Sequence, residues 1–237
     1  MKTLSISLYN RPKYTKQFLN HLEMCYGIEE YKIFISCDPG NKEVEEMAKQ
    51  FRPKQTSLVI NGKRLGCNTN IFQSLAMGFA FNDYHIHFED DTIPGKDCLL
   101  YFEWAGEYYK NNSEVFTISG YVNSNNKTEH YYPMNYAADR VSKRKWFTPW
   151  GWATWKDRFL EMKNAWDFQG KNGSWDATIN HIVRNGRSEV FPTVSRIQNI
   201  GGEMGTHVPN PEWHKAHHYN EHWIDSCNLH SSIFQEA

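Results

Sequence analysis

The sequence predicts an α/β fold, in which a mostly parallel central sheet carries helices on both faces. Short segments with apolar residues at every second position are followed by segments whose apolar residues recur every three or four positions. This alternation occurs three times before residue 90 and favours parallel strands joined by helical crossovers. The 237 residues, 40% hydrophobic and 22% charged, suit one globular domain spanning residues 1–237.

Four segments are expected to form the first strands. They are 3–8, 31–36, 56–60 and 85–88. In the first of these, Leu4, Ile6 and Leu8 alternate with small polar residues, as in a strand with two distinct faces. The segment Tyr9-Asn10-Arg11-Pro12 ends that strand, because proline lacks the amide hydrogen that a sheet needs.

Helices are expected between these strands, over residues 14–24, 42–51 and 69–81. In the first, Phe18, Leu19 and Leu22 recur at helical spacing and predict its buried face. Farther along, we expect helices over 98–110, 156–162 and 176–183 and a strand over 115–119. A turn over 92–95, an exposed loop over 123–135 and a basic run over 140–145 are the remaining expectations.

Composition limits the function classes. The net charge of −1 offers no overall positive field for nucleic acid or an anionic membrane. The five cysteines show no CxxC pair, which indicates free thiols in a reducing compartment. The polar first residues do not resemble a signal peptide, and no apolar run predicts a transmembrane segment. We therefore expect a cytoplasmic protein, in a bacterium or in a host cell if the gene is viral.

The acidic triplet Glu89-Asp90-Asp91 directly follows the fourth expected strand. Ligands of open α/β sheets bind at the carboxyl ends of the strands. Neighbouring carboxylates repel one another unless a cation neutralises them, and hard divalent ions prefer oxygen ligands and often bridge carboxylates to phosphates. The triplet therefore predicts a metal–diphosphate site, and a solvated acidic turn is the alternative.

Two further polar residues follow strands of the same sheet. Arg11 comes after the first strand and can hold a phosphate or a uracil carbonyl through its fork of donors. Asp38 comes after the second strand and can accept a hydrogen bond from a pyrimidine N–H or a ribose hydroxyl. Because parallel strands end at the same edge, Arg11, Asp38 and the triplet are expected to meet in one cleft.

The ordered series of motifs resembles the GT-A glycosyltransferases, most closely the N-acetylglucosaminyltransferase I type and small bacterial family 2 relatives. It comprises strand–Asn-Arg-Pro, strand–Ser-Cys-Asp-Pro-Gly, a Lys-Arg-Leu-Gly loop, and Phe-Glu-Asp-Asp. Downstream, the block Trp150–Trp155, the segment Ser174-Trp175-Asp176 and the segment from Ser195 to His207 continue the resemblance, which covers residues 4 to about 210. Residues 1–120 then form the nucleotide-sugar half, and 121–237 form the acceptor half with a His-rich tail.

The resemblance implies a UDP-sugar donor and a Mn²⁺ or Mg²⁺ cofactor. Asp91 is then the direct metal ligand, Glu89 and Asp90 contact ribose, sugar and metal-bound water, and Arg11 and Asp38 hold the uridine. His207 is expected to bind the metal or the diphosphate, with a loop histidine as the alternative. Three more residues are expected at the donor: Arg64, Trp152 and Arg196. Packing in the core is the alternative for Trp152.

Asp176 is the expected catalytic base, since an acceptor hydroxyl must lose a proton as it attacks the sugar. One base assisting an in-line attack implies inversion at the anomeric carbon. Asp157 and Asp167 are the alternative bases, and a plain helix start is the structural alternative for Asp176. In the tail, the spacing of His214, His218 and His222 allows only a weak prediction of Zn²⁺ or Ni²⁺ binding.

Two acceptors stay open, a glycan and a hydroxymethylated base in DNA, as in viral DNA modification. For a DNA acceptor, the phosphates would be bound by the basic side chains Arg140, Lys143, Arg144, Lys145, Arg184 and Arg187. Two other function classes also stay open. A sugar-nucleotide nucleotidyltransferase would normally carry a glycine-rich loop after its first strand, and a non-catalytic carbohydrate-binding protein would not need the triplet.

Overall fold

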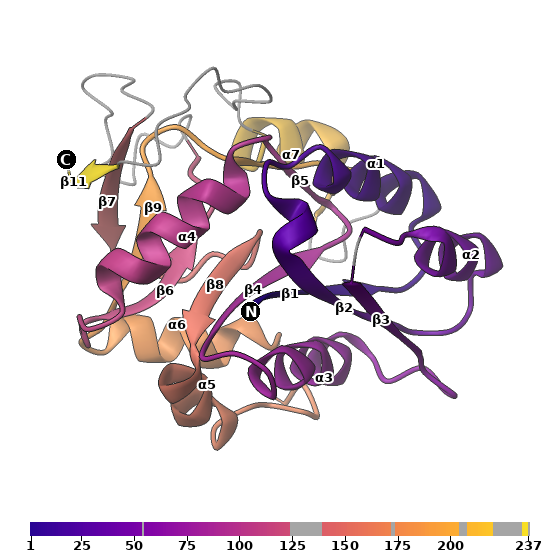
Figure 1. Ribbon diagram of the computed structural model, residues 1–237, viewed down its shortest axis with the longest axis horizontal. Helices are drawn as coiled ribbons and strands as arrows, with labels where there is room; N and C mark the ends of the chain where they lie inside the picture. Colours follow the sequence, from indigo (N-terminus) through magenta and orange to yellow (C-terminus); the bar gives the residue numbers. More distant parts are fainter. Residues whose placement is uncertain (54, 124–138, 172–173, 204–207, 220–233, 237) are drawn as a thin grey trace.

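The computed structural model describes residues 1–53, 55–123, 139–171, 174–203, 208–219 and 234–236. Within these residues the strands form one nine-stranded sheet and one two-stranded sheet (Figure 1). The order in the large sheet is β11 (Gln235–Glu236), β7 (Arg140–Arg144), β9 (Ser188–Pro192), β6 (Val115–Ser119), β8 (Trp152–Trp155), β4 (Tyr84–Glu89), β1 (Lys2–Leu8), β2 (Tyr31–Cys37) and β3 (Gln55–Ile60). The small sheet pairs β5 (Thr92–Pro94) with β10 (Ile197–Asn199).

The large sheet is parallel at its core and mixed on one side. β1 pairs in parallel with both β2 and β4, β2 with β3, and β6 with β9. β8 lies antiparallel between β4 and β6, and β7 lies antiparallel to β9. The predicted mostly parallel sheet is confirmed, and its carboxyl edge collects the ends of β1, β2, β4 and β6.

Helices cover both faces of this sheet, as predicted (Figure 1). On one face, α1 (Pro12–Glu23), α2 (Lys42–Gln50) and α4 (Cys98–Tyr109) pack into a core with β1 and β2. On the other, α3 (Cys67–Phe79), α5 (Lys156–Lys163) and α6 (Asp176–Arg184) enclose a second core rich in aromatic rings. The remaining helices are a 3₁₀ turn (Ile28–Glu30) and α7 (Pro211–His217).

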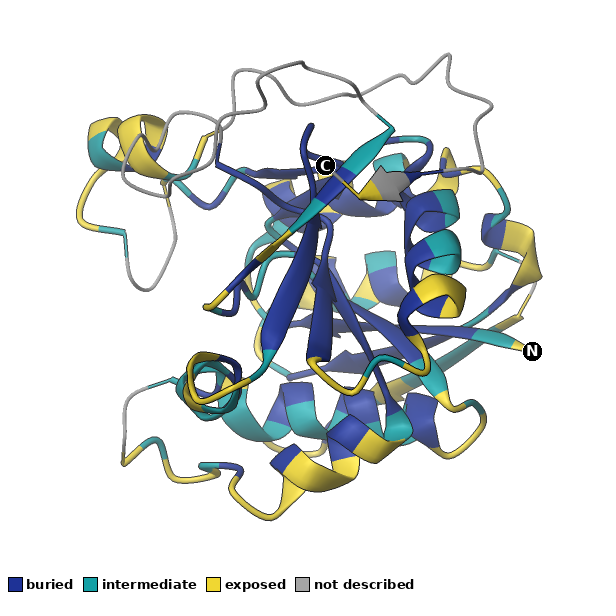
Figure 2. Cartoon of the chain, turned by 90° about the vertical axis from the view of Figure 1, so that its left-hand side faces the viewer, coloured by how far each residue is buried: buried dark blue, intermediate teal, exposed yellow. Residues whose placement is uncertain are grey.

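Local sequence explains where the helices begin and what they bury. Pro12 opens α1, where its missing N–H costs nothing, and Phe18 and Leu22 on its inner face are fully buried. The Asn41 side chain caps α2 by accepting from the amides of Glu43 and Val44. Figure 2 shows the result, with buried strands at the centre and helices exposed along their outer sides.

The turn expected over residues 92–95 was wrong: residues 92–94 form strand β5, because β10 pairs with them from far along the chain. Two strands were not predicted, namely β7 in the basic run and β8 at Trp152–Trp155. Of the expected exposed loop over 123–135, the structure describes Asn123 alone, which is buried.

In the described part of the chain, no helix is both long enough and apolar enough to cross a membrane.

Candidate active site

A cavity of about 1100 Å³ opens at the carboxyl edge of the sheet. One wall comes from the residues that follow β1, β2 and β4, and includes Arg11, Asp38 and the triplet. The facing walls come from the start of α6, from the loop before β8 and from α7. The cleft inferred from the strand ends therefore exists, and it is shared with residues from the second half of the chain.

Arg11 holds two carboxylates of the triplet in place. Its guanidinium donates to Asp91 Oδ2 at 2.5 Å and forms an ion pair with Asp90 Oδ1. Thr15 on α1 donates to the other oxygen of Asp90 at 3.2 Å. Asp90 is 1% exposed and Asp91 is partly exposed, so Asp91 presents its carboxylate to the cavity from a fixed position.

Burial and neighbouring carboxylates raise the pKa values of Glu89 and Asp90. Burial and then the charge of Asp91 raise the pKa of Glu89, and Asp90 and Asp176 act in the same direction. Burial also raises the pKa of Asp90, against the lowering effect of Arg11. For Arg11, burial alone would lower the pKa, but the charges of Asp91 and Asp90 outweigh it and raise the pKa. The site therefore has an excess of negative charge that a cation would relieve.

Asp38 shapes a loop that borders the cavity. Its carboxylate accepts from the amides of Leu65 and Gly66 at 2.9–3.1 Å and from Asn61 Nδ2 at 3.0 Å. Asp38 is 2% exposed, yet it lines the cavity. The exposed Arg64 of this loop places its guanidinium 4.4 Å from the centre of the Tyr9 ring. The sequence missed Tyr9, although it directly precedes the Asn10-Arg11 pair.

Asp176 lines the same cavity as the triplet, at the first position of α6. Its charge contributes to the raised pKa of Glu89, so the two carboxylates are near enough to interact. Trp175, which is 2% exposed, stacks between Trp152 and Trp166 with ring centres 5.8 Å away on each side. The stack fixes the start of α6 and with it the backbone that carries Asp176.

The alternative base Asp157 lies on the surface of α5 and pairs with Arg158, as its position in the sequence suggested. Asp167 does not line the cavity; its carboxylate accepts from the amide of Gln169 at 3.2 Å. Of the three candidate bases, Asp176 is therefore the one that the fold brings to the acidic triplet.

The pairing of β5 with β10 brings a distant segment to Asp91. The amide of Ile200 donates to the Asp91 carbonyl at 2.9 Å. A Cβ at Gly201 would lie 2.9 Å from Asp91 Oδ2, so this glycine is needed for the close approach. His207, the other expected metal ligand, lies outside the described residues.

Two residues expected at the donor lie in the protein core instead. Trp152 is 0% exposed and packs edge-to-face on Phe147, because β8 enters the sheet at this residue. Arg196 is also 0% exposed and donates to Asp97 Oδ2 at 2.9 Å and to the Val194 carbonyl at 2.6 Å. Neither lines the cavity, so the structure does not bring Trp152 or Arg196 to the expected donor site.

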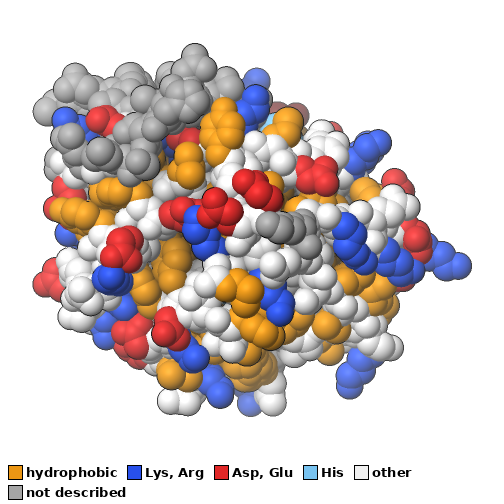
Figure 3. All heavy atoms as spheres, in the orientation of Figure 1, with side chains coloured by type: hydrophobic (Ala, Val, Ile, Leu, Met, Phe, Trp, Pro, Cys, Tyr) orange, Lys and Arg blue, Asp and Glu red, His pale blue; other side chains and the backbone are white. Residues whose placement is uncertain are grey.

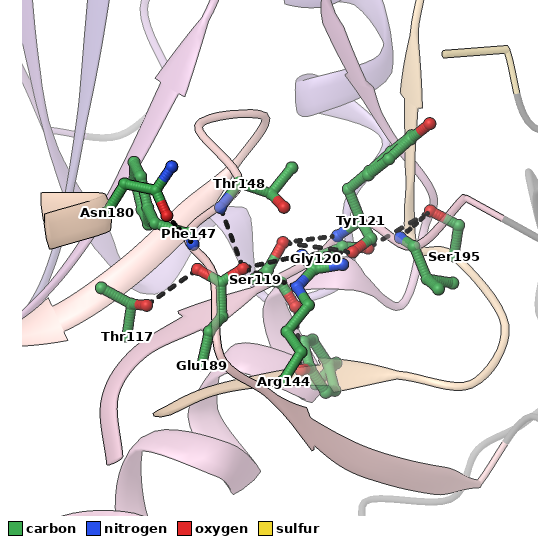
Figure 4. A network of polar contacts seen from close by, with 12 residues as sticks. Thr117, Ser119, Gly120, Tyr121, Arg144, Phe147, Thr148, Asn180, Glu189 and Ser195 are labelled. Atoms are coloured by element: carbon green, nitrogen blue, oxygen red, sulfur yellow. Dashed lines mark hydrogen bonds and ion pairs between the residues drawn. The ribbon is translucent and has the colours of Figure 1, made fainter. Parts of the chain in front are cut away.

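A buried ion pair supports the loop before β8 (Figure 4). Glu189, which is 0% exposed, accepts from Arg144 Nε and Nη2 at 2.9 and 2.7 Å and from the Thr148 amide at 3.0 Å. Thr117 donates to its second oxygen at 2.8 Å. Burial raises the pKa of Glu189, and Arg144 opposes that rise.

The basic run is therefore not the open phosphate-binding loop that the sequence suggested. Arg144 pairs with Glu189 inside the protein, and Lys143 pairs with Glu236 at 2.9 Å. Lys145 donates to the Arg187 carbonyl at 3.0 Å, and Arg187 pairs with Glu161. On the face seen in Figure 3, acidic and basic side chains are interspersed and no continuous basic patch forms.

Sequence reasoning also missed an aromatic end of the cavity. Its described members are Tyr121, Trp146, Trp150, Trp213, His217 and His218. They come from the loop after β6, the loop before β8, and α7 with the residue that follows it. In the sequence, only the density of tryptophans around residue 150 indicated this aromatic group. The histidines were interpreted mainly as a weak metal motif.

Comparison with known proteins supports the fold. No family model matches the sequence, and no curated protein matches it. Among solved structures, a mannosyltransferase from Pyrobaculum calidifontis, PcManGT, in complex with GDP-Man and Mn²⁺, is similar at a TM-score of 0.54 and 14% identity. The similarity covers 82% of this chain and 57% of that one. S. aureus TarS is similar at a TM-score of 0.58 and 14% identity, over 82% of this chain and 37% of TarS.

A shorter form, TarS 1–349, gives a TM-score of 0.57 at 13% identity, over 83% of this chain and 59% of that one. The fold is the GT-A fold of glycosyltransferases. The chain spans roughly a third to three fifths of the length of these structures, and at this low identity the likeness concerns the fold alone.

Proposed function

We propose that this protein is a metal-dependent glycosyltransferase that moves a sugar from a nucleoside diphosphate to an acceptor hydroxyl. The observation that carries the proposal is the arrangement of Asp91, Asp90 and Arg11 at the ends of β4 and β1, in one cavity with Asp176. The GT-A fold supports the same reaction class.

The carboxylates fit a hard divalent cation, Mn²⁺ or Mg²⁺. They offer only oxygen donors, and Arg11 supplies one positive charge against Glu89, Asp90 and Asp91. In the described residues, no group of three His, Cys, Asp or Glu side chains is arranged to hold a metal by itself. In our proposal Asp91 holds the ion and the donor diphosphate completes the coordination, as is common for Mg²⁺.

The bound ion would supply charge neutralisation for the departing diphosphate. Asp176 accepts the proton of the acceptor hydroxyl. At the same time the hydroxyl oxygen bonds to the anomeric carbon, and the bond between that carbon and the diphosphate breaks. Attack from the side opposite the leaving group inverts that carbon. Glu89 and Asp176 line one cavity and are near enough to interact, which supports donor and acceptor meeting close to both.

For the donor we propose a UDP-sugar, held beside Arg11, Asp38 and Arg64. Because Asp38 already accepts hydrogen bonds from the amides of Leu65 and Gly66, its main contribution is to fix the shape of the loop that carries them. The narrower likeness to the N-acetylglucosaminyltransferase I type rests on Ser174-Trp175-Asp176 and the segment from Ser195 to His207, and the block Trp150–Trp155 resembles bacterial members; both likenesses are part of the proposal.

For the acceptor we favour a glycan over a hydroxymethylated DNA base, because the basic side chains of residues 143–145 have partners within the protein. A nucleotidyltransferase is a weaker alternative, since the described loop after β1 holds Arg11 against carboxylates and is not glycine-rich. A carbohydrate-binding protein remains the other alternative.

The proposal is tested by thermal stability with UDP, GDP, CDP or ADP, each with and without Mn²⁺. A bound ligand raises the unfolding temperature by mass action, and we expect a rise for UDP that requires Mn²⁺. Slow release of UDP from UDP-sugars without acceptor would then establish catalysis. A higher unfolding temperature with GDP instead of UDP would indicate a GDP-sugar as the donor. An unchanged unfolding temperature with every nucleotide would favour the carbohydrate-binding protein.

A further inference from the structure

Aromatic rings from three separate segments meet in the lining of the cavity. Trp150 lies with its ring centre 4.4 Å from that of His218 and 4.7 Å from that of Tyr121. Trp213 on α7 lies 4.7 Å from His218 and stacks on His217 at 4.5 Å. Both tryptophans line the cavity and are only partly buried, so part of each indole is accessible to a ligand there.

This aromatic group is held rigidly, because α7 is fastened to the domain at several points. The Tyr121 hydroxyl donates to the His218 carbonyl at 2.6 Å, and Asn123 Nδ2 donates to the His217 carbonyl. The His214 ring nitrogen Nε2 lies 2.8 Å from Asn199 Oδ1, beside the segment that reaches Asp91. The position of Trp213 is therefore fixed relative to the donor side of the cavity.

The loop that carries Trp150 is tied to the helix that carries Asp176. Thr148 donates its amide to Glu189, and Phe147 donates its amide to Asn180 Oδ1 at 3.2 Å (Figure 4). Asn180 lies one turn after Asp176 on α6, and both line the cavity. A ligand resting on Trp150 is thus held at a defined position relative to Asp176.

The described side chains at this end give it little net charge. Arg144, which lines the cavity, is neutralised by Glu189. Burial lowers the pKa of His218 to about 4, which leaves that imidazole uncharged at neutral pH. A polar ring with an apolar face suits such a site better than a phosphate does, since indole rings offer large apolar faces.

We propose that Trp150 and Trp213 form an acceptor platform that binds the ring of an uncharged sugar and directs one of its hydroxyls to Asp176. This inference rests on the proposed function, because it assigns the acceptor of the same reaction. It names the substrate class as a neutral glycoside and makes Trp150 and Trp213 its specificity-determining residues.

The test is the binding of methyl glycosides of glucose, galactose, mannose and N-acetylglucosamine, measured by NMR with UDP and Mn²⁺ present. We expect at least one glycoside to bind the wild type and to bind Trp150→Ala and Trp213→Ala roughly three- to tenfold more weakly, as the loss of one ring contact predicts. Trp213→Phe keeps an aromatic face and should retain most of the affinity. The control Trp104→Ala removes a tryptophan that stacks on Tyr108 outside the cavity and should not change binding.

Stabilisation by UDP and Mn²⁺, measured on every variant, reports folding and the donor site independently of the platform. If that stabilisation is absent in the wild type but the glycoside effects hold, the platform stands and the proposed transferase function fails. Equal glycoside affinity in wild type and both alanine variants would overturn the platform. Failure of every glycoside to bind, or binding only of an oligonucleotide that contains hydroxymethylcytosine, would overturn it too.

Discussion

Asp176 illustrates how one residue is positioned by its neighbours. Its carboxylate belongs to the first turn of α6, and the stack of Trp152, Trp175 and Trp166 holds that turn against the core. A general base needs a fixed position within hydrogen-bond reach of the proton that it accepts. The tryptophans thus position the proposed base.

Replacing Asp176 with Asn should therefore reduce transfer without loss of donor binding. The amide cannot accept the proton, and a general base typically contributes about 10²–10⁴-fold to a rate. Steady-state transfer rates and UDP-dependent thermal stability, measured side by side, check the prediction. Asp157→Asn on the surface of α5 is the matched control, and transfer near the wild-type rate in Asp176→Asn would mean that another group is the base.

For single residues, the sequence predicted the position of those that directly follow a strand. Arg11, Asp38 and Asp91 follow strands of one parallel sheet, so their meeting could be inferred from the order of elements. Trp152 and Arg196 could not be placed in this way, because their burial depends on strand pairing between distant segments.

Among the elements, β8 decides which aromatic residues reach the cavity. It runs antiparallel to β4 and β6, so its first residue, Trp152, lies at the edge where those strands end. The residues before it, including Trp150, line the cavity, while Trp152 itself is inside the sheet. The sequence showed the tryptophans but not the direction of the strand.

The Glu189–Arg144 pair should be the main stabilising contact of the loop before β8. Glu189→Gln leaves the Arg144 charge buried without its partner, and breaking a buried ion pair in this way costs about 3–5 kcal/mol. Glu161→Gln removes the partly exposed pair with Arg187 and should cost at most about 1 kcal/mol. Urea unfolding of both variants measures the difference, and equal losses would contradict the role given to the buried pair.

For the whole molecule, two buried histidines beneath the site link stability to pH. His85 bridges Thr3 and Ser5 at 2.9 and 2.8 Å, and His87 lies 2.9 Å from the same Ser5. Burial lowers the pKa of each histidine from 6.5 to about 3. Between those values the unfolded chain binds more protons than the folded one, so these groups reduce stability as the pH falls.

The variant His85→Gln should therefore show a smaller loss of unfolding free energy than the wild type when the pH is lowered from 6.5 to 4. Carboxylates with raised pKa values, such as Glu89, act in the opposite direction, so the comparison between variants is the informative quantity. His181→Gln, at an exposed position of α6, should keep the wild-type slope. Chemical unfolding across this pH range checks the prediction. An identical dependence of the unfolding free energy on pH in His85→Gln and wild type would contradict it.

The whole fold was more predictable than the composition of the site. The order of strands and helices up to residue 120 indicated a sheet with one ligand edge, and the helices fall within a few residues of the expected ranges. The cavity lining from the second half of the chain depends on β7, β8 and α7, which are short and whose positions arise from contacts such as Arg144–Glu189 and Tyr121–His218. Local patterns do not encode such contacts.

The most direct test of the central claim is the Mn²⁺-dependent binding of UDP to the variant Asp91→Asn, measured by isothermal titration. Asp83→Asn, which changes a well-exposed carboxylate near Lys156, is the matched control. We expect wild type and Asp83→Asn to bind UDP more tightly with Mn²⁺ than without it, and Asp91→Asn to lose that difference while keeping its fold. Undiminished Mn²⁺-dependent binding in Asp91→Asn would contradict a metal–diphosphate site at the end of β4.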